Sequence, residues 1–96
     1  MVSLNNIMDR RCEILRIAAK HGATNVRVFG SIVRGQAGEG SDVDVLVRLD
    51  DDRSLLDHIA LMQDLEDLLG CHVDVVEDRA LHQLIRNRVL AEAVQL

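Results

Sequence analysis

The sequence predicts an α/β fold, in which helices pack on a small mixed β-sheet. Segments with a helical spacing of apolar residues alternate with short strand-like segments, in the order helix, strand, short helix, strand, helix, strand, helix. The long helix between the second and third strands is the usual crossover between parallel neighbours. Because 96 residues leave room for only one core, residues 1–96 are expected to form a single domain.

The first helix is expected over residues 6–21, where apolar side chains fall on one face. Gly22 follows at the place where a left-handed cap would end such a helix. Residues 25–29 alternate between polar and apolar side chains and predict a short strand that runs into Phe29. Phe29 is the only aromatic residue, so the core is expected to be aliphatic.

Gly30 and Ser31 interrupt this strand, and residues 32–35 can form only a short helical turn. Three glycines within residues 35–40 then predict a loop. The glycine–serine pair therefore lies between the end of a strand and the start of a helical turn. Backbone N–H groups at such a position are free to bind an anionic ligand.

Strict alternation begins after Ser41 and predicts the second strand. Asp42 and Asp44 are two residues apart on this strand, so both carboxylates leave the same face, close to each other. The three aspartates at residues 50–52 follow the strand and fit a polar turn better than a metal site.

The second half of the chain shows clear element boundaries. Ser54 is suited to cap a long amphipathic helix that Gly70 ends. Residues 71–76 predict a third strand, which contains Asp74. Asp78 is in place to cap the last helix.

The charge of the chain argues against direct nucleic-acid binding. The formal net charge is −5, and Lys20 is the only lysine among scattered arginines. Proteins that bind DNA or RNA usually carry a basic face and stack bases on aromatic side chains, and this sequence has no Trp or Tyr. Arg79, Arg86 and Arg88 could contact a partner or a nucleotide, but a solvated basic face is favoured.

The remaining composition predicts a cytoplasmic protein. Cys12 and Cys71 belong to no metal-ligand pattern and are expected to be reduced thiols. No apolar run is long enough to span a membrane, and the N-terminus does not read as a signal peptide. No membrane association is expected.

Asp42, Asp44 and Asp74 form the candidate catalytic and metal-binding group. Neighbouring carboxylates repel each other unless a cation lies between them, and their oxygens suit Mg²⁺ or Mn²⁺. Asp74 joins the other two if the third strand runs parallel to and beside the second. Such a cluster can hold two metal ions, one that lowers the pKa of an attacking hydroxyl and one that binds a triphosphate.

Gly30, Ser31 and Arg34 are the candidate phosphate ligands. The glycine lets the backbone approach a phosphate, and the serine adds a hydroxyl donor. Arg34 lies one turn further on and could contact the phosphates or brace the carboxylates. Gly30 and Asp42 share a site only if the first two strands are antiparallel, which is therefore predicted. Gly-Ser alone is usually just a turn, but the combined pattern indicates metal-dependent phosphoryl transfer.

Two stretches carry a resemblance to a known family. VFGSIVRG at residues 28–35, together with GSDVDVLV at residues 40–47, resembles the signature of the minimal nucleotidyltransferase (MNT) family of the DNA polymerase beta superfamily. LGCHVDVV at residues 69–76 is similar to that family's third acidic strand. The resemblance covers nearly the whole chain.

The resemblance implies roles for the same residues. Gly30 and Ser31 would bind the triphosphate, with Ser41 as a further candidate nucleotide ligand. Asp42 and Asp44 would hold the metal ions. The third acidic residue, on the third strand, would help to activate the attacking hydroxyl.

The resemblance also implies a partner. Proteins similar to this one are commonly encoded beside a small helical HEPN toxin, with which the antitoxin forms a hetero-oligomer. The implied reaction uses Mg²⁺, with two ions expected, and transfers AMP from ATP to a tyrosine hydroxyl of the toxin. Two alternatives stay open: an antitoxin that acts by complex formation alone, and an enzyme that modifies a small molecule. The aminoglycoside nucleotidyltransferases of the second class carry an additional domain that is not found here.

Overall fold

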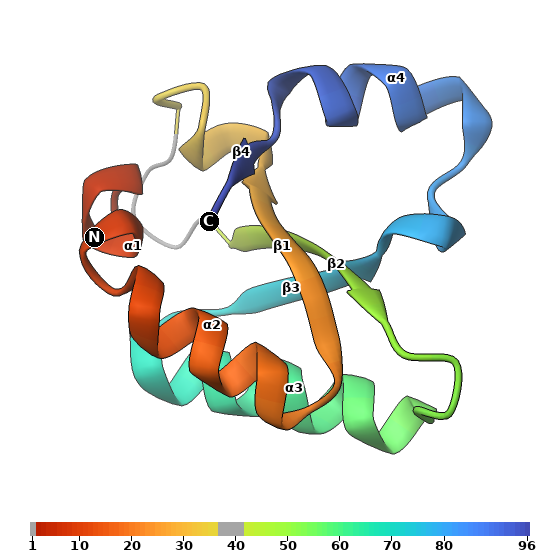
Figure 1. Ribbon diagram of the computed structural model, residues 1–96. Helices are drawn as coiled ribbons and strands as arrows, with labels where there is room; N and C mark the ends of the chain where they lie inside the picture. Colours follow the sequence, from red (N-terminus) through yellow and green to blue (C-terminus); the bar gives the residue numbers. More distant parts are fainter. Residues whose placement is uncertain (1, 37–41) are drawn as a thin grey trace.

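The computed structural model describes residues 2–36 and 42–96. It has the predicted α/β fold, with a four-stranded mixed sheet and helices packed on it (Figure 1). In chain order the elements are α1 (Leu4–Asp9), α2 (Arg11–Lys20), β1 (Ala23–Phe29), the 3-10 turn η1 (Gly30–Ile32), β2 (Val43–Leu49), α3 (Leu55–Leu69), β3 (Val73–Glu77), the 3-10 turn η2 (Asp78–Ala80), α4 (Gln83–Glu92) and β4 (Val94–Gln95).

The strands lie in the order β3-β2-β1-β4. β1 and β2 are antiparallel, and β2 and β3 are parallel with α3 as their crossover, so both predicted pairings are confirmed. β4 was not predicted, because two residues are too few to show a period. It pairs antiparallel with β1 and so brings the end of α4 next to that strand.

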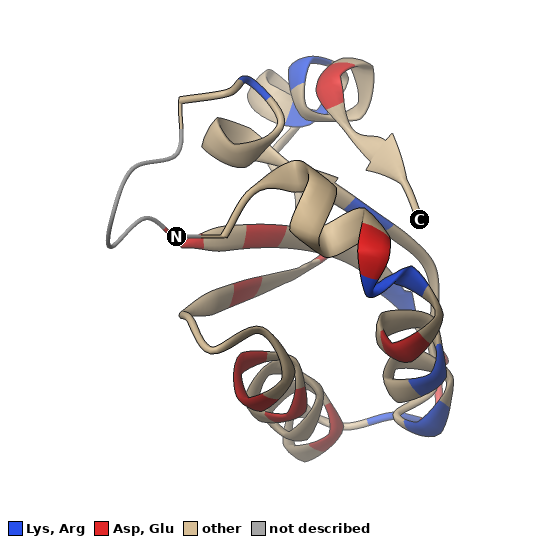
Figure 2. Cartoon of the chain, turned by 90° about the vertical axis from the view of Figure 1, so that its left-hand side faces the viewer, with Lys and Arg blue, Asp and Glu red and all other residues tan. Residues whose placement is uncertain are grey.

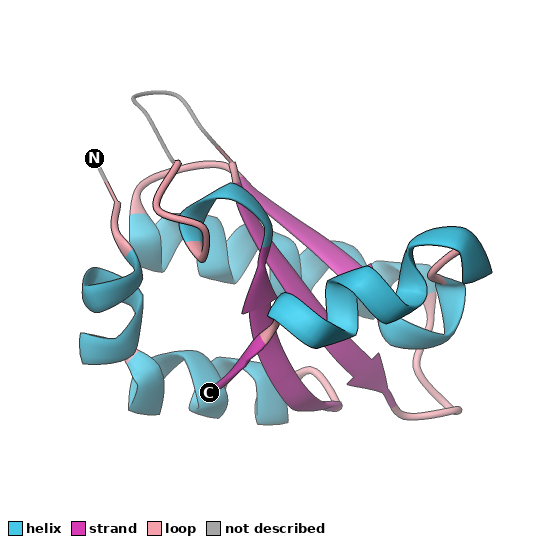
Figure 3. Cartoon of the chain, turned by 90° about the horizontal axis from the view of Figure 1, so that it is seen from above, coloured by secondary structure: helices cyan, strands magenta, loops and turns pink. Residues whose placement is uncertain are grey.

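Helices cover both faces of the sheet. α2 and α3 lie on one face, and α4 crosses the other (Figure 1; Figure 3). The main core is aliphatic, as expected, and Val28, Val47 and Leu61 have no exposed surface. Leu46 points to the opposite face from its valine neighbours and is also fully buried. The central strands are therefore packed on both sides.

The expected first helix is in fact two helices that meet at Arg10. α1 begins earlier than predicted, because Ser3 and Asn6 form a capping box. Arg10 leaves the helical conformation (φ −103°, ψ 15°), and its N–H bonds to the carbonyl oxygen of Ile7. Neither Gly nor Pro marks this break, so the spacing of the apolar residues predicts one continuous helix across it.

α3 begins and ends where the sequence indicates. Ser54 and Asp57 form a capping box, and Gly70 ends the helix in the left-handed conformation (φ 69°). The prediction that Asp78 caps the last helix is wrong. Asp78 begins η2 and is buried, and the side chain of His82 caps α4 instead.

Both cysteines are free thiols, with Cys12 exposed and Cys71 half-buried. Within residues 2–36 and 42–96, no helix combines the length and the apolar character needed to cross a bilayer.

Candidate active site

The ends of three strands meet at one edge of the sheet. Because β1 is antiparallel to β2, Phe29 at the end of β1 lies opposite Asp44 near the start of β2. β3 is parallel to β2 and in register, so Asp74 lies opposite Asp44 on the other side. Neighbouring strands are about 4.8 Å apart, and the two carboxylates leave the same face as direct neighbours. Figure 2 shows acidic segments on these neighbouring strands.

The electrostatics of Asp44 show that these carboxylates repel one another. Burial raises the pKa of Asp44, and the charges of Asp74 and Asp42 raise it further, while Arg34 opposes the shift. Asp44 is half-buried, whereas Asp42 and Asp74 are exposed. A cation among the three carboxylates would relieve this repulsion.

The turn after β1 depends on a glycine. Gly30 has φ +82°, a conformation that residues with a side chain rarely adopt. A Cβ atom at this position would clash with Oδ2 of Asp44. Because glycine is present, the backbone of the Gly30–Ser31 turn approaches the carboxylate of β2 directly. Ser31, the next predicted phosphate ligand, is half-buried in η1.

Glu92, the last residue of α4, closes a hydrogen-bond network at this turn. Its Oε1 accepts a hydrogen bond from the backbone N–H of Gly30 at 3.0 Å. Nη1 of Arg34 donates to both carboxylate oxygens of Glu92, each at 3.0 Å. Burial alone would raise the pKa of Glu92, but the hydrogen bonds from Arg34 and Gly30 outweigh it and hold the pKa below its usual value. Glu92 is therefore an ionised member of the site.

Sequence reasoning missed Glu92. A single glutamate at the end of a helix carries no signal of function, since most such residues are solvated. Its position follows from β4: the short strand pairs Val94 with Val28, and α4 ends two residues before that pair. Only the pairing of β4 with β1 brings residue 92 to the turn at residue 30.

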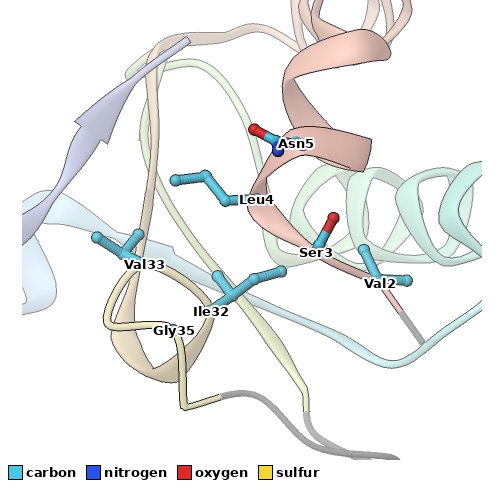
Figure 4. Close-up of a pocket in the computed structure, with 7 residues that line it drawn as sticks. All are labelled: Val2, Ser3, Leu4, Asn5, Ile32, Val33 and Gly35. Atoms are coloured by element: carbon cyan, nitrogen blue, oxygen red, sulfur yellow. The ribbon is translucent and has the colours of Figure 1, made fainter.

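A cavity of about 290 Å³ opens beside Asp44. Its lining combines the end of β1, the start of β2 and the inner face of α4, with Phe29, Gly30, Arg34, Asp44, Ile85, Arg88, Val89 and Glu92. A second cavity of about 350 Å³ lies between the N-terminal segment and η1 (Figure 4). Among the described residues that line it, which include Leu4, Ile32 and Val33, none has an ionisable side chain. The chemistry therefore favours the cavity beside Asp44.

The candidate metal ligands have the chemistry that magnesium requires. Asp42, Asp44 and Asp74 are carboxylates, the oxygen ligands that Mg²⁺ takes, and their repulsion favours a cation. In the part of the chain that the structure describes, no three Asp, Glu, His or Cys side chains are close enough together to hold one ion as they stand. Side-chain rotation about a common strand edge would be needed to bring the carboxylates onto one ion.

Other predicted residues are placed as follows. Ser41 lies outside the described residues. Arg79 binds Glu77, Asp51 and the carbonyl oxygen of Leu49, away from the site. Nη1 of Arg86 donates to the backbone of η2. Arg88 alone of these three arginines lines the cavity beside Asp44.

Comparison with known proteins gives a consistent set of relatives. The family model for the nucleotidyltransferase domain matches residues 11–96. A protein of Methanocaldococcus jannaschii named "Putative protein adenylyltransferase MJ0435" is 40% identical over 91 residues, which cover 95% of this chain and 98% of the relative. Protein adenylyltransferase MntA of Thermococcus cleftensis is 47% identical over 75 residues, which cover 78% of this chain and 76% of the relative.

Solved structures share the fold. A structure described as a "putative minimal nucleotidyltransferase" matches with a TM-score of 0.88 and 47% identity, over 99% of this chain and 97% of that one. A toxin–antitoxin structure with AMP-PNP matches with a TM-score of 0.74 and 23% identity, over 88% and 69% of the two chains. A tri-AMPylated Shewanella oneidensis HEPN toxin in complex with its MNT antitoxin matches with a TM-score of 0.69 and 20% identity, over 92% and 69%. The chain is therefore a nucleotidyltransferase and belongs to the nucleotidyltransferase domain family, among the small proteins described as minimal nucleotidyltransferases.

Proposed function

We propose that this nucleotidyltransferase is an antitoxin that transfers AMP from ATP to a tyrosine hydroxyl of a helical HEPN-type partner toxin in the cytoplasm. The observation that carries the proposal is the register of the three strands. It puts Asp44 beside both Asp74 and the Gly30–Ser31 turn, and Asp44 lines one cavity with Gly30 and Arg34. Relatives named protein adenylyltransferases support the nature of the transferred group.

The proposed reaction exchanges one bond at phosphorus and transfers one proton. The tyrosine oxygen attacks the α-phosphorus of ATP, the bond from that phosphorus to the bridging oxygen breaks, and pyrophosphate leaves. Asp74, exposed beside Asp44, accepts the proton of the attacking hydroxyl. The Gly30–Ser31 turn and Arg34 hold the phosphates in place. Bound Mg²⁺, held by Asp42, Asp44 and Asp74, would supply charge neutralisation on the phosphates.

The identity of the partner rests on the fold neighbours. MNT antitoxins with this fold are found in complex with HEPN toxins, and one such toxin carries AMP groups. A hetero-oligomer also suits the shape of this chain, because the cavity is open and α4 leaves apolar side chains exposed beside it. The partner would then supply the acceptor hydroxyl and part of the binding surface.

The test is a transfer assay with the protein, its neighbouring-gene product, Mg²⁺ and ATP, read by intact mass. We expect the partner to gain the mass of AMP, and the Asp42→Asn/Asp44→Asn double variant to lose this activity by at least about a hundredfold, since the carboxylate pair is removed. Asp50→Asn/Asp52→Asn is the matched control. It removes two carboxylates with the same spacing from an exposed turn, and it should leave transfer unchanged.

Each alternative has its own outcome. A stable complex without any transferred AMP would contradict the enzymatic proposal for this pair and leave an antitoxin that acts by binding alone. Transfer to a small hydroxylated compound, with no modification of the protein partner, would favour the small-molecule enzyme.

A further inference from the structure

We infer that Glu92 is a positioning residue of the active site, which holds Arg34 and the Gly30–Ser31 turn in the arrangement that Mg·ATP requires. The inference rests on the proposed function. It assigns a role to a residue that touches neither the reacting group nor a metal, but that fixes two groups expected to contact the phosphates.

The geometry of the contact supports this role. Glu92 binds one side chain and one backbone group at once: Nη1 of Arg34 lies 3.0 Å from both carboxylate oxygens, and the N–H of Gly30 lies 3.0 Å from Oε1. These partners are 58 and 62 residues away in sequence. Hydrogen bonds to charged groups are stronger than neutral ones, and three on one carboxylate leave it little freedom.

The contact restrains a side chain that would otherwise be mobile. Arginine loses considerable rotamer entropy when it is fixed, and the Arg34 side chain is 38% exposed. Nε of Arg34 also donates to Gln36, so the guanidinium is held from two sides. In this orientation the guanidinium lines the cavity together with Asp44. Burial raises the pKa of Asp44, and the charge of Arg34 offsets part of that rise. The cost of ordering Arg34 is thus met before a nucleotide arrives.

The charge of Glu92 argues against a purely structural link. A fourth carboxylate beside Asp42, Asp44 and Asp74 adds repulsion, and Glu92 itself raises the pKa of Asp44. A neutral side chain could join α4 to the turn without that penalty. A carboxylate is needed only if the guanidinium has to be held by charge and in a fixed orientation.

The experiment compares Glu92→Gln with Glu77→Gln. Glu77 is a matched control, because it is similarly buried (side chain 16% exposed, against 20% for Glu92) and also binds an arginine, but lies at the other end of β3. For both variants we would measure Mg·ATP binding by calorimetry, kcat and KM for AMP transfer to the partner, and thermal unfolding. Arg34→Ala, alone and combined with Glu92→Gln, completes a double-mutant cycle.

We expect Glu92→Gln to weaken Mg·ATP binding or lower kcat/KM by about tenfold, the loss of one charge-assisted contact. Glu77→Gln should leave both unchanged, and the two variants should unfold at similar temperatures. In the Arg34→Ala background, Glu92→Gln should have a much smaller effect on kcat/KM, because only the contact with Gly30 is then left to change.

Four results would overturn the inference. The first is tighter Mg·ATP binding by Glu92→Gln, which would make Glu92 a competitor of phosphate, and the second is an effect of Glu92→Gln on kcat/KM that is as large in the Arg34→Ala background as in the wild type. The third is a Glu92→Gln variant that does not fold, which would make the residue structural. The fourth is that Glu92→Gln and Glu77→Gln bind Mg·ATP and transfer AMP equally well. With an active wild type, such a result rejects the role of Glu92 alone. A wild type that neither binds Mg·ATP nor transfers AMP rejects the proposed function and the inference together.

Discussion

At the scale of single residues, the site is arranged around the contact between Gly30 and Asp44. The left-handed backbone of Gly30 and the lack of a Cβ allow the turn to approach the Asp44 carboxylate. The sequence could predict a glycine–serine turn and a pair of aspartates. It could not predict that the two meet at van der Waals distance, because that depends on the register of β1 against β2.

Gly30→Ala is expected to damage the site. The added methyl group collides with Asp44, and the backbone of alanine must adopt a left-handed conformation that costs about 1–2 kcal/mol. We therefore expect a lower free energy of unfolding and at least a roughly tenfold loss of AMP transfer. Gly35→Ala is the control, because Gly35 is also left-handed (φ +70°), but no atom of the described residues lies within 4 Å of the added Cβ. Thermal unfolding and the AMP-transfer rate would check both variants. Equal activity of the two variants would contradict the role given to the close approach.

At the scale of elements, α4 does two things at once. Ile85, Val89 and Glu92 of this helix line the cavity, and its first turn exposes Leu84 (87%) and part of Ile85 (46%). Neighbouring apolar side chains exposed at the rim of a cavity are candidates for contact with another protein. A protein partner that presents its hydroxyl to the cavity beside Asp44 would approach across this helix.

Leu84→Glu is therefore expected to weaken binding of the helical partner by roughly tenfold or more, the effect of losing one apolar anchor at an interface. Leu56→Glu is the matched control. Leu56 is just as apolar and exposed (77%), but it lies at the start of α3, away from the cavity. Titration of the labelled partner would give both dissociation constants. If Leu56→Glu weakens the complex and Leu84→Glu does not, α3 rather than α4 faces the partner.

At the scale of the whole molecule, Asp78 joins segments that are distant in sequence. Its carboxylate accepts hydrogen bonds from Arg27 on β1 and Arg48 on β2, and its backbone oxygen accepts one from Arg86 on α4. Burial alone would raise the pKa of Asp78, but the hydrogen bonds from Arg48 and Arg27 outweigh it and keep the pKa below its usual value. Asp78 thus joins β1 and β2 through its ionised side chain and α4 through its backbone oxygen.

The depressed pKa of Asp78 predicts how stability depends on pH. The ionised form is favoured in the folded chain, so its contribution is complete above the unfolded pKa of about 4 and is lost as the pH falls through the lower folded value. Asp78→Asn should reduce the free energy of unfolding at pH 7 by about 3 kcal/mol, at the low end for a buried pair because Arg48 is half exposed. It should also flatten the loss of stability in acid.

Denaturant unfolding between pH 3 and 7 would measure both effects. Asp51→Asn is the control, because Asp51 is 91% exposed and pairs with Arg79 at the surface, where such pairs contribute little. A variant Asp78→Asn with the stability and pH profile of the wild type would contradict the role of this buried pair.

The sequence by itself determined the features that repeat or that carry local chemistry. Periodicity gave the order of the helices and strands, and Ser54 and Gly70 fixed the ends of α3. The condition that Gly30–Ser31 and Asp42 share a site predicted the antiparallel pairing, and the long crossover helix predicted the parallel one; both are present. The parallel pairing could be predicted because strands joined by a helix of this length are usually parallel neighbours.

Only the tertiary structure decided what depends on contacts between distant residues. The sequence predicts that Asp78 caps a helix. In the structure it is buried, and its carboxylate pairs with Arg27 and Arg48 from two strands. The break at Arg10 has no residue to mark it, and β4 is too short for any pattern. Glu92 reaches the turn at Gly30 because β4 pairs with β1. For Asp78, β4 and Glu92 the physical reason is the same: the partners that fix these residues lie more than twenty positions away, so the local sequence does not reveal them.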